Sequence, residues 1–398
     1  MISPDNQCAK CGACSVVCPV WRVTGREEHT ARGKLHLLGR LDPAAASETY
    51  AEILSQCLLC GACTAACPRG LDPVAIFLAA RARLNRTAGE HTWLRATAQR
   101  VLGSPTLLPL LAGMGMPLLR RLPAESGMRL RLGLGPAPLP QSQPPQPAAA
   151  SPHPSSATAA CFHGCYASHL RPEIAVAVNR VVTAATGHPP EPIAGQCCCG
   201  LAAEASGDRD TAVALAKRNI TAFADTGLPI VVSCASCFHQ LRRYPRLLAD
   251  DPVWRDKAAA FHDRLVEFSC FAAEHLGALR FSRPGEPHAV LCHDPCHLRF
   301  PKPATAFQRR VVAALPGASL TELPDGPQCC GQGGLFHLAH PETSSAIRDR
   351  LASRLQESQA QLVTTTCSGC LIQLGQTLAE PQDAPRPIHL ALLLTAHL

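Results

Sequence analysis

"CAKCGACSVVCP" occupies residues 8–19, and "CLLCGACTAACP" occupies residues 57–68. Both stretches follow the pattern Cys-x2-Cys-x2-Cys-x3-Cys-Pro, with the same gaps and a proline after the last cysteine. A glycine follows the second cysteine of each, as Gly12 and Gly61, where the missing side chain lets the backbone approach a bound group. Pro19 and Pro68 end the loops and set the entry to a helix. We call these stretches the first and the second cysteine motif.

The spacing of the two motifs is typical of loops that wrap 4Fe–4S clusters. Three closely spaced thiolates hold one cluster, and the fourth cysteine reaches the other cluster in two-cluster ferredoxins. The sequence therefore predicts two 4Fe–4S clusters, the first held by Cys8, Cys11, Cys14 and Cys67, and the second by Cys57, Cys60, Cys63 and Cys18. Structural zinc is disfavoured here, because eight cysteines in two identical motifs exceed the four ligands that zinc takes.

The sequence around the motifs has a helical pattern. The stretches "ARGKLHLLGRL" at residue 31 and "AAASETYAEILSQ" at residue 44 lie between the motifs, and another such stretch follows from residue 72. We therefore expect residues 1–100 to form an α-helical two-cluster ferredoxin-like domain. Arg32 and Lys34, on the first of these helices, are candidates for hydrogen bonds to cluster sulfides, and an exposed helix face explains them equally well.

Residues 101–157 divide the chain. Residues 101–119 are apolar but contain three prolines and three glycines, which makes a poor membrane-spanning helix. This stretch could contact a membrane surface or a partner groove, and we favour a buried hinge between domains. Residues 134–157 are rich in Pro, Ala and Ser and have the composition of a linker.

The C-terminal part repeats itself. "AACFHGCYASHLRP" at residue 159 matches "VLCHDPCHLRFPKP" at residue 290, "GQCCCG" at 195 matches "PQCCG" at 327, and "PIVVSCASC" at 229 matches "QLVTTTCSGC" at 361. Short β-rich runs alternate with helical ones, so we expect two α/β units with mostly parallel strands, over residues 158–285 and 286–398. Both Cys-x-x-Cys pairs follow a strand, where open α/β sheets place their sites.

Each unit offers five cysteines in one register. They are Cys165, Cys198, Cys199, Cys234 and Cys237 in the first unit, and Cys296, Cys329, Cys330, Cys367 and Cys370 in the second. Adjacent cysteines before Gly200 or Gly331 can present two thiolates to an irregular cluster or to zinc. Cys161 and Cys292 end apolar runs, so buried thiols are expected there. His163, His293 and His297 flank the first cysteine of each unit, and we expect them to support the ligands rather than bind metal.

Composition excludes several classes of function. Aromatic residues make up only 4% of the chain, which is low for a nucleic-acid platform built on stacking. The formal net charge of +7 is no nucleic-acid signal, because metal-bound thiolates would offset it. The start of the sequence lacks a secretory pattern, so we expect a cytoplasmic location, where 22 cysteines indicate metal or redox use. The sequence has neither a Gly-rich dinucleotide loop nor a P-loop, so a partner must supply flavin or nicotinamide.

The Cys-Cys-Gly units resemble the cysteine-rich CCG domain of heterodisulfide reductase subunits and of the iron–sulfur subunits of glycolate oxidase, lactate dehydrogenase and anaerobic glycerol-3-phosphate dehydrogenase. The order of domains is most similar to the glycolate/lactate type. The stretch after the first motif is also similar, at Thr24, Gly25, Glu27, Arg32 and Gly33. The resemblance implies electron transfer from an FAD-binding dehydrogenase subunit toward quinone or another acceptor. It also implies a subunit that is inactive alone and contacts the inner face of the cytoplasmic membrane peripherally.

One departure from that group keeps a second function open. Many glycolate/lactate-type subunits have lost part of the final cysteine pair, whereas this chain keeps both pairs, at residues 234/237 and 367/370. Complete units resemble heterodisulfide reductases, where they hold non-cubane 4Fe–4S clusters that split a disulfide. A catalytic role therefore stays an alternative, as does zinc in one unit and a cluster in the other. The sequence does not distinguish glycolate from lactate or glycerol-3-phosphate.

Overall fold

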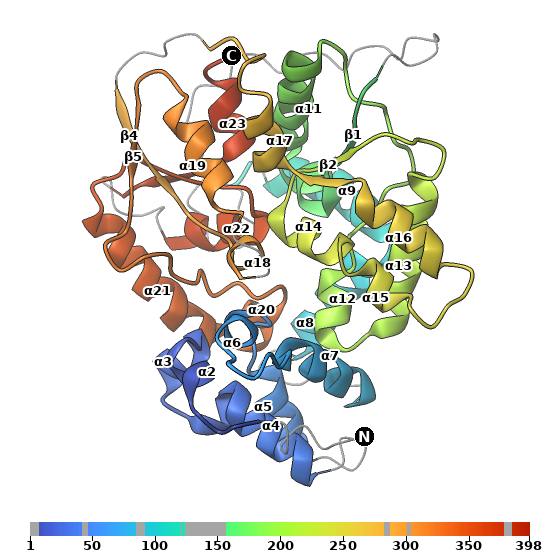
Figure 1. The fold of residues 1–398 in the computed structure, drawn as a ribbon, viewed down its shortest axis with the longest axis vertical. Coiled ribbons are helices and arrows are strands. Elements are labelled where there is room, and N and C mark those ends of the chain that lie inside the picture. Colours follow the sequence, from blue (N-terminus) through green and yellow to red (C-terminus); the bar gives the residue numbers. More distant parts are fainter. Residues whose placement is uncertain are drawn as a thin grey trace.

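The computed structural model describes residues 8–41, 47–84, 92–119, 121–123, 157–281, 287–300, 304–377 and 384–398. In Figure 1 the described residues up to 84 lie below two α/β units that stand side by side. The described elements of the N-terminal part are all helical: α2 (Ala13–Val16), α3 (Pro19–Thr24), the 3-10 turn η1 (Glu27–His29), α4 (Ala31–Arg40), α5 (Glu48–Ser55), α6 (Ala62–Ala65), α7 (Pro73–Leu84), α8 (Thr92–Gly103) and α9 (Leu107–Leu119). The expected α-helical character of this part is confirmed.

Helix α4 is fixed against η1 by its first residues. The Thr30 hydroxyl caps the helix by accepting a hydrogen bond from the Gly33 amide at 3.1 Å. A Cβ at Gly33 would lie 2.3 Å from the Glu27 carbonyl oxygen, so only glycine allows the two segments to pack this closely. This packing turns Lys34 and Leu35 inward, where both are buried.

The first α/β unit follows from residue 157. Its elements are β1 (Ala160–Phe162), the π-helical turn η3 (Tyr166–Leu170), α11 (Pro172–Thr186), α12 (Leu201–Ser206), α13 (Arg209–Ala222), β2 (Ile230–Val232), α14 (Ala235–Leu241), α15 (Tyr244–Leu247), α16 (Arg255–Asp263), β3 (Leu265–Glu267) and α17 (Phe268–Glu274). The three strands form a parallel sheet in the order β1-β2-β3. Strand β1 also makes an isolated parallel bridge from Ala160 to Glu191.

The second unit contains β4 (His288–Cys292), α18 (Cys296–Arg299), α19 (Ala306–Ala313), β5 (Ala318–Thr321), α20 (Phe336–Ala339), α21 (Pro341–Glu357), β6 (Leu362–Thr365), α22 (Ser368–Thr377), β7 (Arg386–His389) and α23 (Leu390–Thr395). Its four strands are parallel in the order β5-β4-β6-β7. The expected parallel α/β character of both units is confirmed.

The two sheets match strand for strand. Strands β1, β2 and β3 correspond to β4, β6 and β7, and the bridge at Glu191 stands where β5 lies in the second unit. The sequence repeat therefore reflects a repeated topology. The strands are short. Every residue of β2 and β6 is buried, as is usual for parallel strands covered on both faces.

The two units share one hydrophobic core. Val178 and Val181 on α11 of the first unit belong to the same buried cluster as Val311 on α19 and Leu393 on α23 of the second. The units therefore pack against each other across a common buried core and are not separate domains joined only by a linker. Figure 1 shows α11 and α17 next to α23 and α19 along this boundary.

Helix α9 departs from the buried hinge that the sequence favours. Leu110, Met114 and Leu118 are 57%, 72% and 66% exposed, and Met116 is the buried apolar residue of the helix. In the part of the chain that the structure describes, no single helix is long and apolar enough to cross a membrane. Helices α8 and α9 pass that test of length and composition only as a pair, with a bend of 108° between them. The Pro-rich stretch at residues 134–157 lies outside the described residues, except for residue 157.

Candidate metal centres

The two cysteine motifs adopt the same local backbone. Lys10 and Leu59, two residues after the first cysteine of each motif, both have φ of 55°, and Gly12 and Gly61 have φ of 82° and 85°. The Lys10 amide donates to the Cys8 sulfur at 3.4 Å, and the Leu59 amide donates to the Cys57 sulfur at 3.5 Å. Backbone amides directed at cysteine sulfur favour the thiolate, the form that binds metal.

The structure brings the proposed ligands of the second cluster around one cavity. Cys18 comes from the end of the first motif, and Cys57, Cys60 and Cys63 come from the second motif, and all four line this cavity. Burial raises the pKa of Cys60 and of Cys63, and the charge of neighbouring thiols raises both further. Thiols crowded in this way need a cation to become thiolates together, so the donor set fits an iron–sulfur cluster.

The contacts bring together only part of the proposed ligand set of the first cluster. Cys8 and Cys14 pack against the same small apolar core as Cys57 and Cys63, and Cys11 is exposed. Helices α2 and α6, which follow the second cysteine of each motif, lie against each other. That Cys67 completes this set stays a prediction.

Two buried cations flank the second set. Lys34 has no exposed surface, and its Nζ donates to the carbonyl oxygens of His29 and, at 3.4 Å, Glu28. Arg81 donates to the Cys57 carbonyl oxygen at 2.9 Å. Burial lowers the pKa of Lys34 to about 8, and the nearby thiols of Cys57 and Cys18 oppose that shift. An exposed helix face is therefore the wrong interpretation for Lys34.

Arg32 has a different role from Lys34. Its Nη1 donates to the Lys10 carbonyl oxygen at 3.2 Å, and its Nη2 lies 2.6 Å from the Glu27 carboxylate. The side chain therefore braces the first motif through its backbone, beside Gly12.

The five candidate cysteines of the first unit form a connected group. Cys198 lies within hydrogen-bonding reach of Cys165 and Cys199, Cys199 of Cys237, and Cys237 of Cys234. Hydrogen bonds from Cys165 and Cys199 hold the pKa of Cys198 well below its usual value. Gly200, which follows the adjacent pair, has φ of 86° and caps α12.

The second unit gathers its cysteines in the same way. The sulfur atoms of Cys330 and Cys370 are 3.3 Å apart, and Cys367 lies within reach of Cys370. A hydrogen bond from Cys370 is the main cause that holds the pKa of Cys330 well below its usual value. Burial raises the pKa of Cys296 well above its usual value, and the charges of Cys60 and Cys329 add to this.

His293, which we expect to support the ligands, hydrogen-bonds to Cys330 and lies close enough to be a ligand itself. Its ring lies with the sulfurs of Cys330 and Cys370 in a buried group whose ligand atoms are all within 4.8 Å of one another. Its position directly after strand β4 was the available signal. A group of one histidine and two cysteines also fits zinc, so the second unit accommodates both metals that the sequence leaves open.

The two units contact each other at their final cysteine pairs. The Ser236 hydroxyl of the first unit lies 3.1 Å from the Cys367 sulfur of the second, and the Ser368 amide of the second donates to the Cys234 sulfur of the first at 3.4 Å. Cys234 and Cys367 are themselves within hydrogen-bonding reach. The contacts are reciprocal, so the pairs form one joint site between the units.

The second cysteine motif packs directly on the second unit. A Cβ at Gly333 would lie 2.5 Å from Leu58, and a Cβ at Gly61 would lie 3.5 Å from Phe300. Cys60 and Cys329 pack against the same buried cluster across this boundary, and the charge of Cys329 raises the pKa of Cys60. His340 closes the contact with hydrogen bonds of 2.8 Å to the Ser55 hydroxyl and 2.9 Å to the Gln56 side chain.

Comparison with known proteins agrees with the presence of two cysteine-rich units and a dicluster domain. The family described as "Cysteine-rich domain" matches residues 159–242 and 290–375, and the family described as "4Fe-4S dicluster domain" matches residues 5–71. The "Lactate utilization protein A" of Bacillus subtilis (strain 168) is 30% identical over 202 residues, which cover 51% of this chain and 84% of that protein. This chain belongs to the same family.

Another relative in this family is the "Probable glycolate oxidase iron-sulfur subunit" of Bacillus subtilis (strain 168). It is 34% identical over 212 residues, which cover 52% of this chain and 46% of that protein, so the matched part spans about half of that relative's length. The resemblance to glycolate and lactate iron–sulfur subunits that the motifs indicate is thus confirmed.

A solved structure supports the fold alone. The crystal structure of a hypothetical protein from Helicobacter pylori superposes with a TM-score of 0.51 at 10% identity, over 88% of this chain and 64% of that one. In this chain, the helical dicluster domain and the paired cysteine-rich units carry the site residues described above.

Proposed function

We propose that this chain is the iron–sulfur electron-transfer subunit of an FAD-dependent 2-hydroxyacid dehydrogenase, with glycolate or lactate as the substrate of the complex. The printed names of the relatives support the iron–sulfur role and the substrate class. The FAD-binding subunit is the proposed electron donor, and quinone or another carrier is the acceptor. On this proposal the chain alone oxidises no 2-hydroxy acid.

The proposed ligands follow the spacing of the motifs. Cys8, Cys11, Cys14 and Cys67 hold one 4Fe–4S cluster, and Cys57, Cys60, Cys63 and Cys18 hold the other. The ten cysteines of the two units hold a further 4Fe–4S cluster, cubane or non-cubane, with zinc as the alternative in one unit. The domain boundaries proposed with them are residues 1–100, 101–157, 158–285 and 286–398.

The observation that carries the proposal is an unbroken succession of thiols. Cys60 and Cys329 pack against one buried cluster across the domain boundary, and the pairs at Cys234 and Cys367 contact each other across the unit boundary. Iron–sulfur clusters supply one-electron transfer when bound to such thiols. The chain's own part is to hold four thiol sets in a row, from the first motif to the first unit.

The decisive experiment is anaerobic purification followed by iron, sulfide and zinc analysis. We expect a brown protein with about eight or more iron and sulfide atoms per chain, as two 4Fe–4S clusters require. Cys60→Ser should lose iron and the visible absorbance of one cluster, whereas Cys270→Ser, on α17 and outside every set, should keep both. A colourless protein without acid-labile sulfide would overturn the proposal.

The partner is tested separately. A tagged chain expressed with the genes that neighbour its own should co-purify with a flavoprotein, and addition of glycolate or lactate should then bleach the iron–sulfur absorbance. Oxidation of a 2-hydroxy acid by the isolated chain would contradict the assigned role.

A second function is favoured by one observation, the joint site at Cys234 and Cys367. Both final cysteine pairs are complete and meet between the units, as a heterodisulfide-reductase-like catalytic subunit would need. This alternative predicts disulfide cleavage with reduced viologen as donor. Retention of that activity in Cys330→Ser would count against it.

We further propose a cytoplasmic location with peripheral contact at the inner face of the cytoplasmic membrane. The exposed apolar residues Leu110, Met114 and Leu118 of α9 support this. In flotation with anionic lipid vesicles, the unaltered chain should move with the vesicles. The double variant Met114→Asp and Leu118→Asp should stay in the lipid-free fraction. Equal flotation of both proteins would refute the contact.

A further inference from the structure

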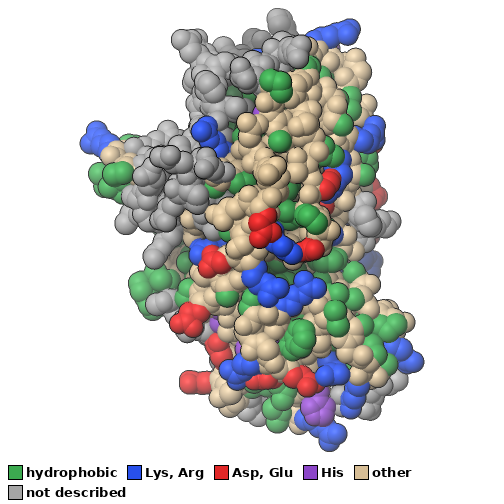
Figure 2. Space-filling model, turned by 90° about the vertical axis from the view of Figure 1, so that its left-hand side faces the viewer, with side chains coloured by type: hydrophobic (Ala, Val, Ile, Leu, Met, Phe, Trp, Pro, Cys, Tyr) green, Lys and Arg blue, Asp and Glu red, His purple; other side chains and the backbone are tan. Residues whose placement is uncertain are grey.

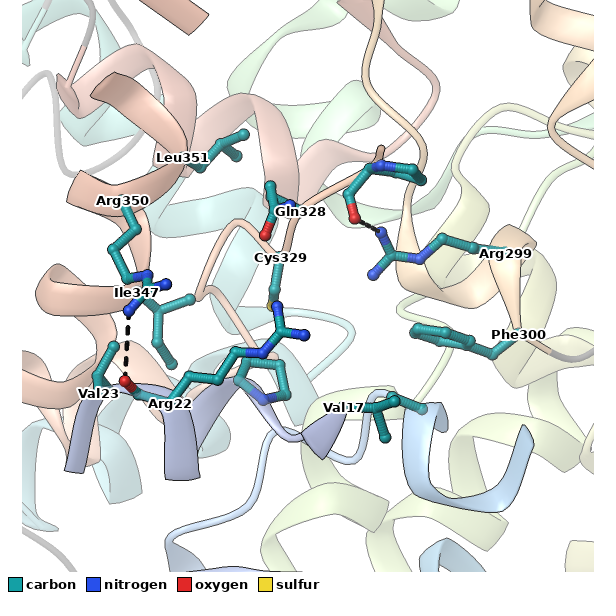
Figure 3. Close-up of a pocket in the computed structure, with 13 residues that line it drawn as sticks. Val17, Arg22, Val23, Arg299, Phe300, Gln328, Cys329, Ile347, Arg350 and Leu351 are labelled. Atoms are coloured by element: carbon teal, nitrogen blue, oxygen red, sulfur yellow. Dashed lines mark hydrogen bonds between the residues drawn. The ribbon is translucent and has the colours of Figure 1, made fainter. Parts of the chain in front are cut away.

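A cavity of about 290 Å³ lies between the N-terminal domain and the second unit, and the functions proposed above give it no role. Helix α3 forms one wall, and the end of α18, the loop after β5 that carries Cys329, and helix α21 form the others (Figure 3). Cys329 lies in its wall, so the cavity borders one of the candidate metal centres. Its volume is at the lower end of the range found for small-molecule sites.

Three arginines surround this cavity. Arg22 comes from α3, Arg299 from α18 and Arg350 from α21. In Figure 3 the side chains of Arg22 and Arg299 reach into the cavity from opposite sides, with Cys329 between them. In Figure 2, basic side chains gather near the middle of the face that lies on the left of Figure 1, where α3 and α21 are found.

None of the three arginines is paired with a carboxylate among the described residues. The nearby carboxylates of Asp349 and Asp325 pair instead with other arginines, Arg348 and Arg354. Three unpaired guanidinium groups around one cavity repel one another, which costs free energy unless an anion enters. The cavity is therefore built with positive charge that the described protein does not balance.

The guanidinium groups are held in place by backbone carbonyls. Arg22 donates from Nε to the Val16 oxygen at 3.0 Å, Arg350 donates from Nη1 to the Arg22 oxygen at 3.3 Å, and Arg299 donates from Nη1 to the Pro327 oxygen. An arginine has five N–H donors, and in the described residues each of the three uses one. The remaining donors are oriented in advance for an oxyanion.

The rest of the lining is apolar. Val17 and Val23 lie on the side of α3, and Phe300, Ile347 and Leu351 lie on the side of the second unit. Arg299 also stacks on the Phe300 ring, with its guanidinium carbon 4.5 Å from the ring centroid. Apolar walls combined with guanidinium groups from three elements favour an anion that carries an apolar body over a bare inorganic ion.

Compensation of the thiols at the metal centre explains only one of the three arginines. Arg299 has that effect, since its charge lowers the pKa of Cys329 against the larger effect of burial. Arg22 and Arg350 are exposed residues on α3 and α21. They are therefore available to a ligand.

We propose that this cavity binds an organic carboxylate, with its oxyanion held by Arg22 and Arg350 and its apolar body against Phe300 and Ile347, beside Cys329. The proposal does not depend on the electron-transfer role. It places a small-molecule site at the boundary where the second cysteine motif meets the second unit.

The test is isothermal titration calorimetry of the anaerobically purified full chain with 2-naphthoate at low ionic strength. We expect saturable binding with one site, and binding about tenfold or more weaker for 2-naphthalenemethanol, which lacks the charge. The double variant Arg22→Gln and Arg350→Gln should also weaken naphthoate binding about tenfold or more. Arg255→Gln, an exposed arginine on α16 of the first unit, should bind as the unaltered chain does.

Three results would overturn the proposal: no binding of 2-naphthoate, equal binding of the neutral alcohol, or unchanged binding by the double variant. Iron content and circular dichroism show whether the double variant is folded. If it is not, the exposed Arg350→Gln alone gives the decision, since binding equal to that of Arg255→Gln would also overturn the proposal.

Discussion

Among single residues, Lys34 has the most unusual environment. A fully buried ammonium group is costly, and here two backbone carbonyls and the neighbouring cysteines offset that cost. The residue lies close to Cys57 and Cys18 from opposite motifs, so its charge acts on any group that these thiols share. A positive charge near an iron–sulfur cluster favours the reduced form, which carries more negative charge.

Replacement of this charge should therefore shift a potential. We expect Lys34→Met to lower the reduction potential of the cluster proposed at the second set by on the order of 100 mV, from Coulomb's law at the effective dielectric of a protein interior. An EPR-monitored redox titration measures the shift directly. Lys217→Met, which removes a lysine paired with Asp251 on the first unit, is the matched control. Equal potentials in both variants, with full iron content, would show that Lys34 has only a structural role.

Lys34 also shows where sequence reasoning stopped. The residue was recognisable as a candidate, but its burial depends on the close approach of α4 to η1 at Gly33. A helical pattern gives the period of a helix and not the partner that covers each face. The distance of His293 from Cys370 was not predictable for the same reason, since it depends on how β4 and α22 are placed in three dimensions.

Among the elements, the loop after β5 that carries Cys329 and Cys330 packs closely against α21. Gly331 has φ of 83°, and a Cβ there would lie 2.6 Å from the Ser344 carbonyl oxygen on α21. Gly326, in the same loop, has φ of 72° with no atom within 4 Å of its Cβ position. A side chain at Gly326 would therefore meet backbone strain alone, whereas a side chain at Gly331 would meet backbone strain and a steric clash.

Alanine at these two positions should give different losses of stability. We expect Gly326→Ala to cost about 1 kcal/mol, from the left-handed backbone alone. Gly331→Ala should cost about 3 kcal/mol, because α21 must also shift. Thermal unfolding of the two variants under anaerobic conditions measures the difference, and equal losses would show that α21 yields easily.

The repeated elements were the most predictable part of the fold. Strands such as "PIVVSC" and "QLVTTTC" are identifiable by composition, and the match between them predicts one topology used twice. Helix α9 was not predictable in the same way. Its apolar sequence favoured a buried hinge, whereas its leucines are exposed, because an apolar composition does not specify the surface that covers it.

In the whole molecule, Arg81 connects the N-terminal domain to the first unit. It donates to the Leu54 carbonyl at 2.8 Å and the Ser55 carbonyl at 3.1 Å on one side, and to the Ala205 carbonyl at 2.7 Å on the other. Gly207 permits the contact, since a Cβ there would lie 2.4 Å from the Arg81 carbonyl oxygen. One buried cation thus satisfies acceptors from two domains.

Loss of this cation should uncouple the domains. We expect Arg81→Gln to destabilise the protein by roughly 3 kcal/mol, because several buried carbonyls lose a charged donor. Limited proteolysis should then release the N-terminal domain, and urea unfolding should broaden or split into two transitions. Arg83→Gln, an exposed arginine on the same helix, should behave as the unaltered chain does. A single sharp transition in both variants would contradict the coupling.

The relative placement of the N-terminal domain and the two α/β units could not be predicted from the sequence. The spacing of the cysteines predicts which residues form each set, and the order of the sets depends on docking contacts such as Leu58 against Gly333. Such contacts join residues far apart in the chain and leave no periodic pattern. The cavity at Arg22, Arg299 and Arg350 arises from the same docking, with one arginine on each of three separate elements.

The reciprocal contact between the units also constrains how the protein is made. Ser368 and Cys367 are translated more than a hundred residues after Cys234, whose sulfur they complete. A nascent chain that has left the ribosome only as far as the first unit therefore exposes Cys234 without its contacts from the second unit. If the joint site binds a metal, as we propose, its final form can be reached only after the second unit has been synthesised and has docked on the first.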